Sequence, residues 1–252
     1  MIHNCRASSI SLKGKRKRIE DFYYINPESG IFIVADGVAG APNGDLASRF
    51  IVNHLAESLE KKLFEKNKTP EETKEILRKE TIRTGNRFMD YVKENQDKLE
   101  YLGQPKTTLT AVALADSSIV YIHVGDSALF TISSKNTIRR ITDVVPFFIG
   151  SILDIEDFMG LFQKGIYKLD RNDTGFILFT DGFYNHLIDK ARREKRLNRS
   201  YTSLRRQSED PAFEKELNLL LKGYENPAKV IDSIRDECLD AGDNVTVIYG
   251  LF

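Results

Sequence analysis

Tryptophan is absent from this chain of 252 residues, cysteine occurs twice, and the formal net charge is zero, with 37 acidic and 37 basic residues. Cys5 and Cys238 lie far apart and form no Cys-x-x-Cys pair, so they provide no disulfide framework and fit a reducing cytoplasm. No apolar run reaches the roughly 18 residues that a membrane-spanning helix requires, and no apolar segment of a signal peptide precedes the first strand. We therefore expect a cytoplasmic protein with neither a membrane nor a nucleic-acid partner, because a neutral chain has no global field that attracts polyanions.

The composition is uniform along the chain and predicts one domain over residues 1–252. With 41% hydrophobic and 29% charged residues, the chain can bury one substantial core. Two stretches depart from the general pattern. Residues 143–174 have weak periodicity interrupted by Pro and Gly, and we expect them to form a flap-like lobe over the functional site. Residues 190–210 are rich in Lys and Arg, which is typical of a solvated surface insertion.

Three segments have the periodicity of amphipathic helices. Apolar residues recur at helical spacing over residues 45–66. A second helix, over residues 69–98, opens with Thr69 and Glu72 at the spacing of a capping box, and Pro suits the first helical position between them. A third helix is predicted to begin at Asn226-Pro227 and to end by Gly242.

Short β-branched and aromatic runs between turn-forming residues predict the strands. Residues 22–35 are typical of a hairpin, residues 107–141 of an antiparallel meander, and residues 176–180 and 245–251 of two further strands. Runs of strands combined with pairs of long helices predict an α+β fold, a four-layer α-β-β-α sandwich of two antiparallel sheets flanked by helices.

Four Asp residues stand at the ends of strand-like runs, each followed by a small or polar residue. A carboxylate costs too much free energy to bury alone, so several carboxylates at strand ends indicate a shared divalent cation with oxygen ligands. For any single one, an Asp that favours a turn after a strand is a sufficient explanation, and the prediction depends on the set. The four occur in the pairs Asp36-Gly37, Asp126-Ser127, Asp181-Gly182 and Asp243-Asn244.

Six blocks, in their order and spacing over nearly the whole chain, resemble the metal-dependent type 2C Ser/Thr protein phosphatases in their bacterial-like, single-domain form. The resemblance implies hydrolysis of phosphoserine and phosphothreonine in proteins by a water that bridges two metal ions. It also implies phosphorylated protein substrates and an opposing Ser/Thr kinase, and we expect a monomer. The blocks are Arg16 with Glu20-Asp21, residues 35–40, residues 106–108, residues 124–127, residues 179–182 and residues 242–246.

The resemblance implies a centre of two or three Mn²⁺ or Mg²⁺ ions. Asp36 resembles the bridging carboxylate, and the backbone carbonyl of Gly37 resembles a further ligand, where Gly permits a tight turn. Whether Glu20 or Asp21 serves the second ion stays open. The remaining ligand candidates are Asp181 and Asp243 at the first ion and Asp126 at a weaker third ion.

Arg16 lies five residues before Asp21, the spacing at which this family places an arginine against the substrate phosphate. A planar guanidinium binds phosphate oxygens bidentately and so orients the group for attack. Arg18 is the alternative candidate, because basic residues cluster over 15–18. Thr107 and Thr108 are interpreted as strand residues that support the site without a catalytic role.

Departures from the family pattern favour an alternative, a non-catalytic regulatory or phosphoprotein-binding module on the same fold. Ala39 replaces a Gly, Ala128 replaces an Arg, and Asp-Val-Val at 143–145 replaces Asp-His-Ser. None of these changes removes a metal ligand, so we favour the enzyme. A nucleic-acid binder that uses the basic patches at 13–18 and 192–206 is disfavoured by the neutral charge.

Overall fold

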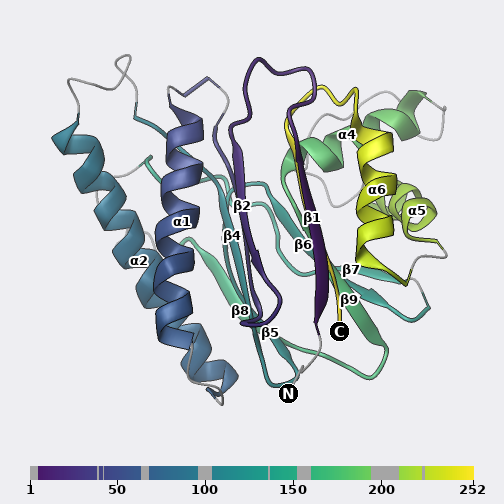
Figure 1. Cartoon of the computed structure of the whole chain (residues 1–252), viewed down its shortest axis with the longest axis horizontal. Helices are drawn as coiled ribbons and strands as arrows, with labels where there is room; N and C mark the ends of the chain where they lie inside the picture. The colour runs from purple at the N-terminus through teal and green to yellow at the C-terminus, as the bar shows by residue number, and fades with distance from the viewer. Residues whose placement is uncertain are drawn as a thin grey trace.

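A computed structural model describes most of the chain, and two five-stranded sheets packed face to face lie at its centre (Figure 1). All neighbouring strands within each sheet are antiparallel. Helices cover the outer face of each sheet, so the predicted four-layer sandwich is confirmed. The described residues are 5–38, 40–41, 43–63, 68–95, 104–135, 137–151, 160–193, 210–222 and 225–252.

The first sheet contains both the first and the last strand of the chain, with β1 and β10 paired along their full lengths. Its strands, in spatial order, are β1 (Arg6–Leu12), β10 (Val245–Leu251), β9 (Asp173–Phe179), β6 (Ala128–Ser133) and β7 (Ile138–Arg140).

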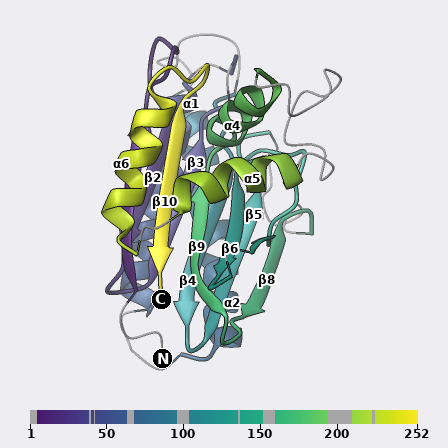
Figure 2. The same ribbon diagram turned by 90° about the vertical axis from the view of Figure 1, so that its right-hand side faces the viewer.

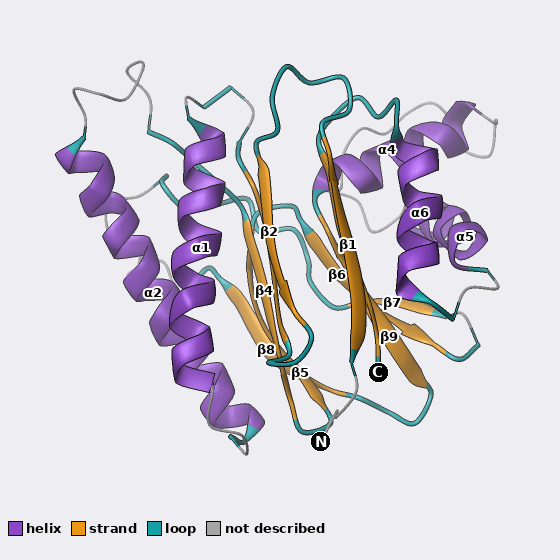
Figure 3. Ribbon diagram, viewed as in Figure 1, coloured by secondary structure: helices purple, strands orange, loops and turns teal. Residues whose placement is uncertain are grey.

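The second sheet is built around the predicted hairpin at residues 22–35. Its strands, in spatial order, are β2 (Asp21–Asn26), β3 (Ile31–Asp36), β4 (Leu109–Ala115), β5 (Ser118–Val124) and β8 (Gln163–Lys168). The chain therefore passes between the sheets several times, first through the loop of residues 13–20 that joins β1 to β2 (Figure 3).

Five helices within the described residues form the two outer layers. Figure 2 shows α4, α5 and α6 in front of β9 and β10, and α1 and α2 lie over the opposite sheet. Their bounds are α1 Gly44–Leu63, α2 Pro70–Glu94, α4 Asp181–Arg193, α5 Asp210–Leu221 and α6 Pro227–Cys238. None of the helices in the described ranges is long and apolar enough to cross a membrane.

Two of the predicted helix starts are confirmed by their capping contacts. Thr69 Oγ1 accepts a hydrogen bond from the backbone N–H of Glu72, and the Glu72 carboxylate accepts one from the backbone N–H of Thr69. Asn226 caps α6 by accepting from the N–H of Ala228. Helix α6 ends at Cys238, before Gly242, so its predicted end is wrong by a few residues.

The predicted meander over residues 107–141 is wrong. Strands β4 and β5 pair in one sheet, whereas β6 and β7 pair in the other. The chain crosses between the sheets at residues 125–127. Turn-forming residues mark where a strand ends but not which sheet the next strand joins, so the sequence pattern left this crossing undetected. The crossing is important because it contains Asp126.

The stretch 143–174 does not form a separate lobe throughout. Residues 163–168 form β8, an edge strand that pairs with β5, and its mixed polar sequence gave no clear alternation. Nearer the start, Val145 pairs with Gly125, and Ile149 pairs with Thr107, beside the candidate site. Residues 152–159 lie outside the described residues, as do 194–209 of the predicted basic insertion; residues 190–193 end α4.

Phe213 anchors α5, a helix that the sequence pattern did not reveal. Its ring is fully buried and lies 4.6 Å from the Tyr184 ring and 5.3 Å from the Phe179 ring, measured between centroids. We expect Phe213→Ala to lower the free energy of unfolding by about 3–5 kcal/mol, because it leaves a cavity among these rings. Leu219→Ala is the matched control on the same helix, where the side chain is 55% exposed and a change below about 0.5 kcal/mol is expected. Urea unfolding of both variants measures the difference, and equal losses would contradict the anchoring role.

Candidate functional site

The predicted carboxylates meet at one end of the sandwich, where strands of both sheets end. Asp21 opens β2 and Asp36 closes β3, and the two are register partners across that pair of strands. Asp181 is the first residue of α4, directly after β9. Burial raises the pKa of Asp36 well above its usual value, and the charges of Asp21, Asp181 and Asp126 raise it further. The structure therefore brings together carboxylates that are up to 160 residues apart in the sequence.

Asp21 is the most deeply buried of these carboxylates, with 4% of its surface exposed. Its Oδ2 accepts a hydrogen bond of 2.7 Å from Thr180 Oγ1, whose oxygen in turn accepts from the backbone N–H of Thr246. Its Oδ1 is buried and has no hydrogen-bond partner among the described residues. Burial raises the pKa of Asp21 to about 6. An unpaired, desolvated oxygen of this kind is a position that a cation would satisfy.

Asp181 and Asp36 influence each other's pKa, so their carboxyl groups lie close together. Burial raises the pKa of Asp181 to about 7, with a further contribution from the charge of Asp126. Asn185, one turn along α4, donates to Asp181 Oδ2 at 2.9 Å and fixes its orientation. Both Asp36 and Asp181 are partly exposed, as the entry of an ion requires.

Two threonines that lie just before β4, and not within a strand as predicted, hold the backbone of Asp36. The Asp36 carbonyl accepts from Thr108 N at 2.8 Å and from Thr107 Oγ1 at 2.9 Å. Thr108 Oγ1 accepts from Asp36 N and also contacts Ser127 Oγ at 2.9 Å. Because Ser127 follows Asp126, this chain of hydroxyl contacts connects the end of β3 to the crossing between the sheets.

Gly37 provides the close approach of α1 to the site. Its N–H donates to the carbonyl of Glu20, which also accepts from Ser48 Oγ on α1. A Cβ at position 37 would lie 2.8 Å from the Cα of Gly44, the first residue of α1, and still closer to other backbone atoms there. A larger residue would thus push the helix away from the carboxylates.

Glu20 and Asp21 have different surroundings. The Glu20 side chain is partly exposed. Burial of its carboxyl group raises its pKa, and the charges of Arg18, Asp45, Arg16 and Asp243 also influence that pKa. The Asp21 carboxyl lies instead against Thr180 and the Asp36 side chain. Of the two, Asp21 is the one in the buried group of carboxylates.

Arg16 contacts the candidate ligand Asp243 directly. Its Nε and Nη2 donate to Asp243 Oδ1 and Oδ2, each at 2.5 Å, in the bidentate geometry that a guanidinium also forms with phosphate. Arg18 points elsewhere, with Nη1 4.0 Å from Asp45 Oδ1. The structure thus places Arg16 at the carboxylates and Arg18 at their margin.

The donor set fits hard divalent cations. Carboxylate and backbone carbonyl oxygens are the ligands that Mg²⁺ and Mn²⁺ prefer, and the raised pKa values of Asp21, Asp36 and Asp181 record negative charge that a cation would neutralise. Within the described ranges, no three Asp, Glu, His or Cys side chains already form a group ready to hold an ion. An ion that binds Asp243 would have to displace the Arg16 guanidinium from it.

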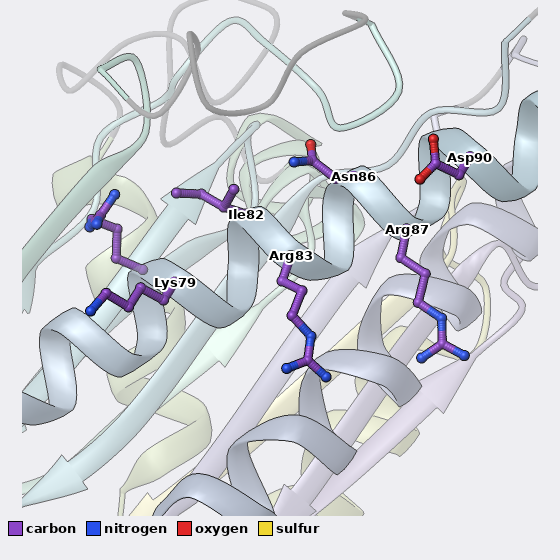
Figure 4. A pocket seen from close by; sticks show the side chains of 7 residues that line it. Lys79, Ile82, Arg83, Asn86, Arg87 and Asp90 are labelled. Atoms are coloured by element: carbon purple, nitrogen blue, oxygen red, sulfur yellow. The ribbon is translucent and has the colours of Figure 1, made fainter.

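Two hollows of the surface lie away from the candidate site. One of about 570 Å³ follows α2, where Arg83 and Arg87 extend to one side of the helix and Asn86 and Asp90 to the other (Figure 4). Another of about 950 Å³ lies between α1 and α2 and reaches Asp45. Neither is lined by a candidate metal ligand, so the size of a hollow does not indicate the site in this protein.

The fold and the arrangement of carboxylates define a phosphatase-like architecture, and comparison with known proteins identifies the family. The chain matches the protein phosphatase 2C family over residues 17–222 and belongs to it. It is 34% identical over 113 residues to the serine/threonine phosphatase stp of Listeria welshimeri, a match that covers 45% of this chain and 42% of that protein. The matched region thus spans less than half the length of this curated relative.

Two solved structures share the fold over nearly their whole length. A bacterial serine phosphatase has a TM-score of 0.74 at 19% identity, and the match covers 98% of each chain. The catalytic domain of the serine/threonine protein phosphatase PstP, solved in complex with two manganese ions, has a TM-score of 0.69 at 18% identity, over 98% of this chain and 97% of that one.

Three residues of the site had no role assigned from the sequence. Thr180 holds Asp21, Asn185 holds Asp181, and Asn244 contacts the loop that contains Arg16. The only signal for them was their position beside a candidate Asp or one helical turn from it. A neighbour in sequence does not show where a side chain will point, so these roles became visible only in the structure.

Proposed function

We propose that this protein is a metal-dependent phosphatase that hydrolyses phosphoserine and phosphothreonine in proteins. The observation that carries the proposal is the convergence of three buried or partly buried carboxylates, Asp21, Asp36 and Asp181, near Asp243, which the guanidinium of Arg16 contacts. Family membership and the name of the Listeria relative support the reaction and the substrate class.

The candidate ligands separate into three groups around the centre of the carboxylates. Asp36, between the others, would bridge two ions, and the backbone carbonyl of Gly37 would add a ligand. The burial of Asp21 and its unpaired Oδ1 support Asp21 over Glu20 as the acidic ligand of the second ion. The remaining candidates are Asp181 and Asp243 at the first ion and Asp126 at a third.

When bound, two Mn²⁺ or Mg²⁺ ions supply a water that loses its proton near neutral pH, and they neutralise the charge that develops on the phosphoryl oxygens. The guanidinium of Arg16 would bind two of those oxygens and orient the phosphorus for in-line attack. The new bond joins the water oxygen to phosphorus, and the bond to the Ser or Thr oxygen breaks. Val38 has no side-chain proton to donate at the family's position, so the departing Ser or Thr alkoxide oxygen would take a proton from solvent.

A bound ion would change the contacts that Arg16 can make. Arg16 engages both oxygens of Asp243 and has the same two donors to offer to phosphate. An ion that takes Asp243 would therefore free Arg16 for the substrate. We further propose phosphorylated proteins as substrates, made by an opposing Ser/Thr kinase, and action as a cytoplasmic monomer.

Hydrolysis of a phosphothreonine peptide tests the function. We expect turnover with Mn²⁺ or Mg²⁺ and a loss to background with EDTA, restored by excess metal. Phosphotyrosine and phosphoserine peptides of the same sequence define the substrate class. A folded protein that binds Mn²⁺ in calorimetry but hydrolyses none of these peptides would favour the alternative, a non-catalytic phosphoprotein-binding module, which the Ala128 and Asp143-Val144-Val145 departures motivate.

A further inference from the structure

Asn244 is a buried amide at the junction of the two loops that form the site. It lies between Asp243 and the start of β10, and 3% of its surface is exposed. A buried Asn side chain must satisfy one acceptor and one amide donor group, so its contacts show what it holds. All of them reach the loop of residues 13–20, more than 220 residues earlier in the chain.

The contacts of Asn244 tie both ends of that loop. Its Oδ1 accepts from the backbone N–H of Glu20 at 2.7 Å, while its Nδ2 donates to the carbonyl of Lys13 at 2.8 Å and to that of Arg18 at 3.1 Å. Lys13 and Arg18 flank Arg16 on either side. One side chain thus closes the loop around the residue that faces Asp243.

The loop also lies directly on the segment that precedes Asn244. Lys15 N donates to the carbonyl of Ala241 at 2.8 Å. Gly14 has a φ of +59° in the left-handed region, and a Cβ there would lie 2.6 Å from the Ala241 carbonyl oxygen and still closer to that of Asp243. Only glycine permits this approach, so the two loops pack against one another without a side chain between them.

The chemistry of the three contacts requires an amide. An Asp of the same shape could accept from the Glu20 N–H but could not donate to the carbonyls of Lys13 and Arg18. A Leu could do neither and would leave the Glu20 N–H and the Arg18 carbonyl without this partner, while the Lys13 carbonyl would keep only its hydrogen bond from Arg16 N. The pattern of donors and acceptors is therefore specific to Asn at this position.

We propose that Asn244 is a positioning residue that fixes the loop of residues 13–20, and through it Arg16, at the candidate metal centre. The expected change in KM rests on the proposed function, whereas the role of Asn244 in holding the loop of residues 13–20 does not. It also explains why the guanidinium of Arg16 lies within reach of Asp243, since Asp243 and Asn244 are adjacent and Asp243 Oδ1 accepts from the N–H of Asn244 at 2.8 Å.

Hydrogen exchange measured by mass spectrometry on the metal-free protein tests the structural part. In Asn244→Ala, amides of the segment 13–20 should exchange at least several times faster than in the wild type. The matched control is Asn226→Ala, which removes another side-chain contact to a backbone N–H, at the start of α6, and should leave this segment unchanged. Asn244→Asp keeps the shape and the Glu20 contact, so it serves where the Ala variant does not fold, with faster exchange expected between Lys13 and Arg18.

Steady-state kinetics test whether the effect passes through Arg16. Asn244→Ala should raise KM for the phosphopeptide roughly tenfold, as supporting contacts around metal and phosphate sites typically do, but should raise it little further when Arg16→Ala is already present. Unchanged exchange of the loop, or a KM increase that persists in full on the Arg16→Ala background, would overturn the proposal. A wild-type protein without any turnover would refute the proposed function alone, because the exchange result stands by itself.

Discussion

Asp181→Asn should remove most of the metal-dependent hydrolysis and, without metal, make the protein more stable. In the proposed function the carboxylate would help to hold a cation whose stabilisation of the transition state amounts to several kcal/mol, so we expect kcat to fall roughly a hundredfold or more. In the metal-free protein the same carboxylate is desolvated and faces the charges of Asp126 and Asp243, which is why its pKa is raised to about 7. The amide has nearly the same shape and can still accept from Asn185.

The stability of the two proteins with and without Mn²⁺ provides the measurement. A carboxyl group whose pKa is higher in the folded than in the unfolded protein destabilises the fold as the pH rises above its unfolded pKa. The effect is complete above its folded pKa, so the gain in stability from Asp181→Asn should be clearest at about pH 8. Differential scanning fluorimetry should then show a metal-free midpoint a few degrees higher in the variant and a smaller rise on adding Mn²⁺. Asp189→Asn, at an exposed ion pair with Arg192 on the same helix, should change neither quantity. A variant that keeps the full metal-induced rise would exclude Asp181 as a ligand.

Arg16→Ala should weaken the binding of substrate and tighten the binding of metal. Loss of a bidentate, charge-assisted contact to phosphate is worth about 1.5–3 kcal/mol, so KM should rise roughly 10- to 100-fold. The same substitution removes the guanidinium from both oxygens of Asp243, which it contacts at 2.5 Å in the wild type. The apparent Kd for Mn²⁺ should therefore fall several-fold.

Calorimetric titration with MnCl₂, free of phosphate, measures the second effect separately from the first. Arg18→Ala is the control, because its guanidinium lies 4.0 Å from Asp45 and contacts none of the ligand candidates. We expect nearly unchanged metal binding and a smaller rise in KM. If Arg16→Ala bound Mn²⁺ as weakly as the wild type or more so, Asp243 would not be a ligand that Arg16 blocks. If instead Arg18→Ala gave the larger rise in KM, the phosphate-binding role would belong to Arg18.

The elements that the sequence predicted are those with a strong local signal. The hairpin of β2 and β3 has its turn formers between two apolar runs, and α2 has a complete capping box. Strand β8 lacked such a signal, since its residues are polar and mostly half-buried at a sheet edge. Helix α4 did have apolar residues at helical spacing, but the Lys and Arg at its end favoured an interpretation as an insertion. The division of strands between two sheets depends on long-range packing, which periodicity does not encode.

The acidic residues of the candidate site could be predicted from the sequence, but the residues that hold them in place could not. Asp36, Asp181 and Asp243 each stand beside a strand-like run, and the family resemblance gave them their roles. The contact of Arg16 with Asp243 joins loops 227 residues apart, and no local pattern reports it. The choice between Glu20 and Asp21 likewise depends on which of two adjacent side chains turns inward, and the register of β2 against β3 supports Asp21.

The hydrogen bond from Thr180 to Asp21 has a further consequence, because the two residues belong to different layers of the molecule. Thr180 follows β9 of one sheet, and Asp21 opens β2 of the other. Because candidate ligands come from both sheets, an ion bound at this point would hold the two sheets of the sandwich together. Separation of the two sheets would move the candidate ligands apart, so partly opened forms of the protein should be inactive. The cation concentration should therefore govern how often the two sheets separate.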